Sequence, residues 1–343
     1  MNYSVTEKIK VGVIGYGGAF NMGRSHLKEM QKAGMTPAAA CDLDIERLKI
    51  AEEEFPGIKT FTSVDAMLTE ADVDMITIIT PHNTHAELAL KCLESGRHVV
   101  CEKPLAVTTE ECDQMIAAAK KNDLVLSTYH NRHWDGCILR AREQIENGII
   151  GDVVRIEAHM GQYGNPGDWW RTSKKISGGI LYDWGVHLLE YALQLLPKSN
   201  MTEVSSYCKQ GVWADQTKWK DDTNEDEAQA VVRFDTGQWL SLNITQLDAN
   251  PKEGQLEITG TRGSYLFSGG WWKTITIEDG VKVTREGRNP KSEGWRFYQN
   301  IADHLVKGTE LMITPEWARR PIHVLDLAGE SAREGISYRT KYN

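Results

Sequence analysis

Hydrophobic positions in the first 130 residues form short, continuous runs that are separated by amphipathic stretches. The runs predict strands at Lys10–Ile14, Thr36–Cys41, Met75–Ile79, His98–Cys101 and Val125–Thr128. Helices are expected between them, at about 24–33, 45–54, 64–69, 84–95 and 109–121. Continuous apolar runs of this length are typical of parallel strands that are covered on both faces. The alternation therefore predicts an α/β domain over residues 8–130, built on a doubly wound parallel sheet.

After about residue 150 the apolar positions alternate instead, and turn residues separate the strands. Strands are predicted at Val153–Met160, Glu203–Lys209, Ala228–Phe234, Trp239–Gln246, Glu253–Gly260, Gly263–Phe267, Trp272–Glu278 and Val281–Thr284. Helices are expected at about 136–147, 179–196, 293–307 and 315–336. Asp235-Thr-Gly237 and Glu278-Asp-Gly280 have the composition of hairpin turns. The pattern predicts a second, α+β domain over 131–343 with a large, open, mainly antiparallel sheet, and its last helix is a candidate to pack back on the first domain.

The strands of this second sheet carry apolar residues at both odd and even positions. Trp239, Leu242 and Ile244 cannot all face one side of a strand, because successive side chains point to opposite faces. With Val231 on the neighbouring strand, both faces of the sheet are expected to be substantially apolar. Monomers seldom expose such a surface, so we expect a homodimer or homotetramer that pairs these sheets.

Composition and charge narrow the class of protein. The chain has 343 residues and a formal net charge of -9, which disfavours binding to nucleic acid or to an anionic membrane. No apolar run approaches the ~18 residues of a membrane span. Residues 1–9 lack the apolar core of a signal peptide, and the six cysteines form no CxxC motif. We therefore expect a cytoplasmic protein that acts on a small molecule.

A glycine-rich turn follows the first predicted strand. Gly15, Tyr16, Gly17 and Gly18 lie between that strand and a helix, where glycines allow a pyrophosphate to approach backbone amides. The third glycine of a G-x-G-x-x-G motif would be residue 20, which is Phe20, and the next glycine is Gly23. The turn is either enlarged by about three residues or simply a strand–helix corner.

Asp42 ends the second predicted strand, about 25 residues after Gly17. An acid at this place can bind both hydroxyls of the adenosine ribose, and Asp44 would repel a 2′-phosphate. NAD is therefore the expected cofactor, although Arg47 keeps NADP possible. Asp42 could instead cap the helix at 45–54, a role that Asp44 could also fill.

Three further residues have the chemistry that oxidation of an alcohol needs. Hydride leaves a carbinol as its hydroxyl proton is removed, and His187 has a suitable unperturbed pKa for that base. Asp183 lies four residues earlier, on the same face of a predicted helix. Lys103 can stabilise negative charge on the reacting oxygen. A helix-capping Asp183 and a buried structural His187 are the alternative.

Several motifs together resemble those of the glucose–fructose oxidoreductase, inositol dehydrogenase and MocA family over the whole chain. They are Gly15-x-Gly17, Thr80-Pro81-x-x-x-His85, Glu102-Lys103-Pro104 and Gly178-Gly179-x-x-x-Asp183-x-Gly185-x-His187. The resemblance implies an N-terminal Rossmann domain, a C-terminal domain with an open sheet, and oxidation or reduction of sugars, cyclitols or related polyols with NAD or NADP. It assigns catalysis to Lys103, Asp183 and His187, and it implies an oligomer.

Other residues are expected beside cofactor or substrate because of their place at strand ends. The family places Thr80 and Pro81 along the cofactor, with Asn83 and His85, although His85 could simply pack its helix. Glu102 is expected at the nicotinamide ribose, Asn131 at the nicotinamide and Arg132 at a substrate hydroxyl. Trp170 and Arg171 are expected to border the substrate, whereas His130 and His133 could belong to a solvated loop.

Two enzyme classes remain open at this point. One is a dehydrogenase with net transfer of hydride. The other is an NAD-retaining glycosidase or lyase. Such an enzyme oxidises a ring hydroxyl transiently, carries out an elimination at the glycosidic bond, and then reduces the oxidised ring again. A non-enzymatic NAD-binding regulator is disfavoured by the intact Lys103, Asp183 and His187. The spacing of His and acidic residues matches no metal motif, so no metal is expected.

Overall fold

The computed structural model describes residues 9–18 and 20–342. They form two compact units. The first is the chain up to Asn131 together with Trp295–Arg319, and the second is Arg132–Gly294 together with the chain from Arg320 onward. The segment Trp295–Arg319, which contains α9 (Arg296–Lys307), thus groups with the first unit, whereas the sequence predicted one continuous second domain from 131 to 343.

The first unit is built on a six-stranded parallel sheet with the order β3-β2-β1-β4-β5-β6. Its strands are β1 (Lys10–Ile14), β2 (Thr36–Cys41), β3 (Lys59–Phe61), β4 (Met75–Ile78), β5 (His98–Cys101) and β6 (Leu126–Thr128). Its helices include α1 (Met22–Lys32), α2 (Ile45–Glu54), α3 (Val64–Glu70), α4 (His85–Glu94) and α5 (Thr109–Lys121). The predicted doubly wound sheet is confirmed, and β3 is the strand that sequence reasoning missed.

The strand order places the ends of several strands at one edge of this sheet. The chain turns back between β1 and β4, and in such folds the ligand binds beyond the carboxyl ends of the strands at that point. Gly15 follows β1, Asp42 follows β2, Thr80 lies two residues after β4, and Glu102 follows β5. Parallel pairing therefore collects these residues at the same edge.

The second unit contains a nine-stranded sheet with the order β14-β13-β12-β11-β7-β10-β9-β8-β15. The strands are β7 (Val153–Gly161), β8 (Met201–Lys209), β9 (Glu227–Phe234), β10 (Trp239–Thr245), β11 (Leu256–Gly260), β12 (Gly263–Phe267), β13 (Trp271–Glu278), β14 (Val281–Arg288) and β15 (Tyr338–Arg339). β10 pairs with β7 in parallel, and the other pairs are antiparallel. The prediction of a large, mainly antiparallel sheet is confirmed.

Four helices accompany this sheet: α6 (Gly136–Glu146), α7 (Lys174–Ser177), α8 (Leu181–Leu195) and α10 (Pro315–Glu334). α8 packs on β10 and β7, which form the middle of the sheet. Gly185 makes this contact close, because a Cβ at that position would lie 3.1 Å from Leu242 Cδ2. The catalytic helix expected from sequence is therefore seated on the most internal strands of the unit.

On β9 and β10 the face of the sheet opposite α8 is mostly polar, so the expectation that both faces of these strands are apolar is wrong. In β9 and β10 the buried positions alternate with more exposed ones, and Leu242 and Ile244 face the core. The alternate positions carry mostly polar residues, such as Gln229, Arg233 and Asn243. The sequence reasoning generalised from Val231 and Trp239, which are the apolar residues that β9 and β10 place on that face.

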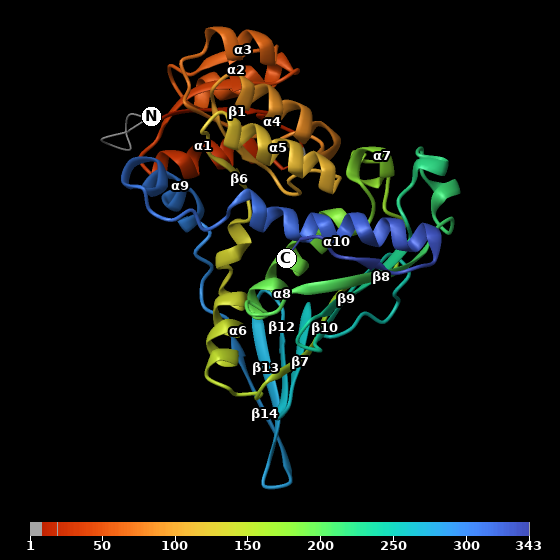
Figure 1. The fold of residues 1–343 in the computed structure, drawn as a ribbon. Helices are drawn as coiled ribbons and strands as arrows, with labels where there is room; N and C mark the ends of the chain where they lie inside the picture. Colours follow the sequence, from red (N-terminus) through yellow and green to blue (C-terminus); the bar gives the residue numbers. More distant parts are fainter. Residues whose placement is uncertain (1–8, 19, 343) are drawn as a thin grey trace. The chain divides into compact units, whose positions relative to one another are not determined.

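The segment between β8 and β9 contains two short 3₁₀ turns, Ala214–Gln216 and Lys220–Asp222. A bridge between Thr223 and Ser173 ties this segment to the chain entering α7, and the two lie side by side in Figure 1. In the part of the chain that the structure describes, no helix is both long and apolar enough to cross a membrane.

Candidate functional site

The glycine turn after β1 depends on residues without a side chain. Gly15 has φ +92°, and a Cβ there would lie 2.2 Å from the Ile79 carbonyl oxygen. Gly18 has φ +101°, and a Cβ there would meet only the Arg47 guanidinium, 3.7 Å away. Gly15 is therefore required by the packing of β1 on the neighbouring strand, whereas Gly18 lies at an open surface. Residue 19 falls outside the described residues.

The third glycine of the turn is Gly23, as the enlarged-turn alternative predicts. A Cβ at Gly23 would lie 2.4 Å from the Tyr16 carbonyl oxygen and 2.5 Å from Tyr16 Cα. The first turn of α1 therefore packs directly on the backbone of the glycine turn. α1 begins after Asn21, whose side chain makes no capping hydrogen bond. Its N-terminal amides and the positive end of the helix dipole are thus available to a phosphate.

Asp42 is bonded to the glycine turn itself. Its Oδ2 accepts hydrogen bonds from the backbone amides of Tyr16 (2.9 Å) and Gly17 (3.1 Å), and its side chain is almost fully buried. Asp44, not Asp42, caps α2, because Asp44 Oδ1 accepts from the Glu46 amide at 3.0 Å. The capping role therefore belongs to Asp44, and the contact of Asp42 with a ribose stays a prediction.

Arg47 lies over the outer side of this turn. Its guanidinium is 3.6 Å from Asp42 Oδ1 and 3.3 Å from Asp44 Oδ2, and its stem would contact a Cβ at Gly17. Tyr16 points the other way: its ring is buried and its hydroxyl donates to Glu54. Tyr16 can therefore contribute to a bound cofactor through its backbone.

Hydrogen bonds between its own residues fix the segment that follows β4. The hydroxyls of Thr80 and Thr84 are hydrogen-bonded at 2.7 Å, around a 3₁₀ turn that contains Asn83 and follows Pro81. The imidazole of His85 is fully buried, with Nε2 2.9 Å from the Thr80 carbonyl oxygen and Nδ1 2.7 Å from the Pro104 carbonyl oxygen. His85 therefore joins the end of β4 to the Glu102–Pro104 segment, which favours the packing role over direct contact with cofactor.

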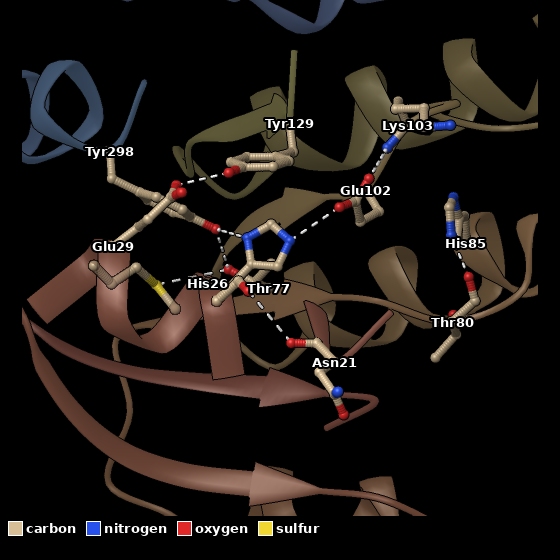
Figure 2. Close-up of polar contacts among 12 residues, drawn as sticks. Asn21, His26, Glu29, Thr77, Thr80, His85, Glu102, Lys103, Tyr129 and Tyr298 are labelled. Atoms are coloured by element: carbon tan, nitrogen blue, oxygen red, sulfur yellow. Dashed lines mark hydrogen bonds and ion pairs between the residues drawn. The ribbon is translucent and has the colours of Figure 1, made fainter. Parts of the chain in front are cut away.

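Glu102 belongs to a buried network that Figure 2 shows. Its Oε1 lies 3.0 Å from Nε2 of His26, and its Oε2 accepts a hydrogen bond from the Lys103 amide at 3.0 Å. The Nδ1 of His26 is 2.6 Å from the Tyr298 hydroxyl, which is 3.1 Å from Thr77 Oγ1. Helices α1 and α9 and strand β4 thereby fix the carboxylate that precedes Lys103.

This network keeps Glu102 ionised. Burial alone would raise the pKa of its carboxyl group, but the hydrogen bond from His26 and the charge of Lys103 outweigh burial, and the pKa is lowered. The Glu102 side chain is 14% exposed. In Figure 2 the side chain of Lys103 extends away from the network, and its peptide bond to Pro104 is cis.

In the second unit, α8 carries Asp183 and His187 one turn apart. Asp183 Oδ2 accepts a hydrogen bond from Nη1 of Arg171 at 3.1 Å. The His187 ring is largely buried and packs edge-on against Trp184, with 5.6 Å between ring centroids. The guanidinium of Arg132 lies 4.9 Å from the centre of the Trp184 ring. The second unit thus gathers these five side chains on and around the first half of α8.

The residues after β6 are more buried than a solvated loop. His130 and His133 are nearly inaccessible, and Nδ1 of His133 is 2.6 Å from Oε1 of the buried Glu190. The solvated-loop alternative is therefore wrong for both histidines. Asn131 is half-buried at the start of the turn Asn131–Trp134, and Arg132 pairs with Asp135 at 3.0 Å.

Sequence reasoning missed His26 and Tyr298, which support Glu102. They are 272 residues apart, and neither belongs to a motif that would have signalled the contact. Within residues 9–18 and 20–342, no group of three or more His, Cys, Asp or Glu side chains has the arrangement of a metal site.

Comparison with known proteins identifies the same two domains and their family. Residues 9–130 match the oxidoreductase family with an NAD-binding Rossmann fold, and residues 138–266 match the GFO/IDH/MocA C-terminal domain. The chain belongs to the GFO/IDH/MocA oxidoreductase family. Its first unit is an NAD-binding Rossmann domain, and the family's activity is that of NAD(P)-dependent dehydrogenases and oxidoreductases.

Three similar proteins illustrate the range of the family. The uncharacterised oxidoreductase YdgJ of Escherichia coli is 32% identical, over 82% of this chain and 78% of its own. The scyllo-inositol 2-dehydrogenase (NADP⁺) IolW of Bacillus subtilis is 24% identical, over 96% of this chain and 95% of its own. A levoglucosan dehydrogenase solved with NADH and levoglucosan has the same fold, with a TM-score of 0.82 at 21% identity over 97% of this chain and 99% of its own.

Proposed function

We propose that this protein transfers hydride between a nicotinamide cofactor and a secondary hydroxyl or ketone of a sugar, a sugar derivative or a cyclitol. The observation that carries the proposal is the arrangement on α8, where Asp183 and His187 share one face and Asp183 is held by Arg171. The names of the relatives, which include an inositol dehydrogenase and a levoglucosan dehydrogenase, support the substrate class.

The residues of the first unit fit a bound dinucleotide. The glycine turn with its uncapped α1 would hold the pyrophosphate, and Asp42 would hold the adenosine ribose. Thr80, Pro81, Asn83 and Asn131 lie at or near strand ends on the same side of the sheet and would line the nicotinamide half, with Glu102 at its ribose. When bound, the nicotinamide accepts or donates the hydride.

The protein's own groups manage the proton. His187 acts as general base toward the substrate hydroxyl, and Lys103 donates a hydrogen bond to the same oxygen as negative charge develops on it. Asp183, charge-paired with Arg171, orients substrate or imidazole from one turn away. Glu102 stays anionic and buried, and its bond to the Lys103 amide fixes the backbone from which the lysine extends.

NAD is the cofactor that the turn favours. Asp42 and Asp44 place two carboxylates near the predicted ribose, which disfavours a 2′-phosphate. Arg47 is charge-paired with both acids, and this pairing reduces its availability to a phosphate. NADP use requires Arg47 to leave these carboxylates.

The function is tested with sugars, glycosides and inositols, each offered with NAD and with NADP. Absorbance of the reduced nicotinamide and release of product are followed together. We expect stoichiometric NADH with at least one polyol. Cleavage of a glycoside without net NADH, with cofactor retained through purification, would replace the proposal with an NAD-dependent glycosidase or lyase. Absence of both reactions across the panel would contradict it.

We further propose that the enzyme works in the reducing cytoplasm and as a homo-oligomer. All six cysteines are free thiols and five are buried, which supports a reducing compartment. The family resemblance supports the oligomer. Because the outer face of β9 and β10 is mostly polar, a contact between copies through these strands would be polar.

A further inference from the structure

Five aromatic side chains gather on two neighbouring loops of the second unit. We call Tyr163, Trp169, Trp170, Trp213 and Trp219 the aromatic platform. Tyr163 is 64% exposed and Trp169 is 39% exposed, and the other three are half-buried. Large aromatic side chains stabilise a fold mainly when their apolar area is buried in a core. Packing in a core therefore does not explain why several of them are partly exposed at one place.

Hydrogen bonds hold the rings of the platform in place. Trp219 Nε1 donates to the Trp169 carbonyl oxygen on the other loop at 3.0 Å, and Trp213 Nε1 donates to the Gln246 carbonyl oxygen at the end of β10 at 3.3 Å. Tyr163 packs edge-on against Trp213, with 5.5 Å between ring centroids. The indole N–H groups of Trp213 and Trp219 are thus satisfied by the backbone, while parts of the rings remain exposed.

Backbone contacts reinforce this arrangement. The Lys218 amide donates to Asp168 Oδ1 at 2.7 Å, and Asn165 Nδ2 donates to the Gln216 carbonyl oxygen at 3.1 Å. At the base, Asn224 Nδ2 donates to the Arg171 carbonyl oxygen at 2.7 Å. Hydrogen bonds join the two loops at several points along the chain. They therefore fix the positions of the rings before a ligand binds.

The platform is continuous with the proposed active site. The Arg171 guanidinium lies 5.1 Å from the ring centres of both Trp169 and Trp170, and its Nη1 is 3.1 Å from Asp183 Oδ2. One side chain therefore links the α8 carboxylate to two indole rings. A ligand that touches Asp183 and extends by one more sugar ring could reach the platform.

The chemistry of the platform matches a carbohydrate ring. A pyranose has apolar C–H faces, which stack on aromatic faces, and hydroxyls at its edge. The platform has charged groups beside its rings: Arg171 by Trp169 and Trp170, and Lys218, whose Nζ lies 4.7 Å from the Trp219 ring centre. Rings flanked by hydrogen-bonding groups suit a sugar better than a wholly apolar partner.

We propose that the aromatic platform is a subsite for a second sugar ring, so that the substrate is a glycoside or oligosaccharide whose other ring is oxidised. The proposal rests on the proposed function and narrows its substrate class. It predicts that a two-ring substrate gains binding energy that a one-ring substrate cannot, and it assigns a role to the segment between β8 and β9 that no motif predicts.

The test compares one-ring and two-ring compounds. The methyl glycosides of glucose, galactose and mannose are assayed against disaccharides with the same reacting ring, in wild type and in Trp169→Leu. We expect kcat/KM for the best disaccharide to exceed that of its methyl glycoside by about tenfold or more. Trp169→Leu should lower kcat/KM for the disaccharide more than for the methyl glycoside, so that this advantage is lost. Trp169→Phe should restore part of it.

A matched control is Trp239→Leu, because Trp239 is 38% exposed on the outer face of the sheet, close to the exposure of Trp169. It should leave the preference intact. Disaccharide titrations followed by tryptophan fluorescence provide a readout that does not depend on turnover, and circular dichroism checks that each variant is folded. If polyols are oxidised without preference for a second ring, and no disaccharide changes the fluorescence, the subsite proposal is wrong. If fluorescence responds but no polyol is oxidised, the proposed function fails instead.

Discussion

Glu102 precedes the proposed catalytic lysine and has both carboxylate oxygens engaged, one with His26 and the other with the Lys103 amide. His26 is fully buried, so this is a polar contact made inside the domain rather than a surface ion pair. Buried charges are retained when they are paired and hydrogen-bonded. The carboxylate therefore works as a fixed anchor for the backbone that carries Lys103.

Substitution of the proposed proton-transfer residues should reduce turnover strongly. We expect Lys103→Ala and His187→Ala each to lower kcat by about two to four orders of magnitude, the range for loss of a general base or of a donor to the developing oxyanion. NAD affinity should change little in His187→Ala. Steady-state kinetics with the best substrate, together with NAD titration, measure both effects. Turnover near that of wild type in both variants would remove these residues from the mechanism.

Asp42→Ala should weaken NAD binding more than NADP binding, because the lost contacts are to ribose hydroxyls, one of which NADP lacks. The change also releases the Tyr16 and Gly17 amides, which would affect both cofactors alike. Thr108→Ala is the control, since it removes the capping box of α5 and should cost about 1 kcal/mol of stability without altering the cofactor preference. Equal weakening of the two cofactors by Asp42→Ala would assign Asp42 a purely structural role.

At the scale of elements, the position of α1 depends on a single missing side chain. Gly23 lets the helix start lie against the Tyr16 backbone, and the helix in turn brings His26 to Glu102. The glycine turn and the Glu102 network are thus coupled through one helix. In the second unit, Gly185 has a similar effect, because it seats α8 on β10.

Gly23→Ala should therefore destabilise the protein and weaken NAD binding. Its Cβ would lie 2.4 Å from a backbone oxygen, which cannot move aside without shifting the turn. We expect the free energy of unfolding to fall by about 1–3 kcal/mol. Gly329→Ala is the matched helix control, because a Cβ there meets only the flexible end of Arg333, 3.6 Å away. This substitution should raise the free energy of unfolding by about 0.4–1 kcal/mol. Thermal unfolding and NAD titration distinguish the two, and equal behaviour of both variants would contradict the packing argument.

At the scale of the whole molecule, each unit has its own sheet and its own share of the proposed chemistry. The first unit contains the cofactor residues and Lys103, and the second contains Asp183, His187 and the aromatic platform. The segment Trp295–Arg319 is assigned to the first unit and supplies Tyr298 to its core. Residues late in the chain therefore complete a network that begins on α1.

We expect a homo-oligomer whose contacts on the outer face of the nine-stranded sheet are largely polar. Strands β7 to β9 present charges of both signs there, including Arg155, Glu157, Glu227 and Arg233. Two copies related by symmetry can pair such charges, and salt weakens that pairing. Light scattering should give a multiple of 38.6 kDa at micromolar concentration, with a lower mean mass in 1 M salt. A single-chain mass at low salt would contradict the expectation.

The sequence alone determined most elements of the fold and the candidate residues of the site. Continuous apolar runs predicted the parallel strands, and alternating apolar and polar residues predicted the second sheet. Local motifs identified Gly15, Asp42, Lys103 and His187 as candidates. These features are local, because hydrophobic periodicity and turn chemistry act over a few residues. The same locality explains why β3 was missed, since Lys59–Phe61, of which the first residue is exposed and the other two are half-buried, form no apolar run.

Only the tertiary structure decided which side chains meet. It gave the cap of α2 to Asp44 and bonded Asp42 to the glycine turn, made Gly23 the third glycine, and buried His85 between two carbonyl oxygens. It also gave β9 and β10 a mostly polar outer face and brought Tyr298 to His26. Such contacts join residues tens to hundreds of positions apart, and they follow from how packed elements exclude water and satisfy buried polar groups, which no short stretch of sequence encodes.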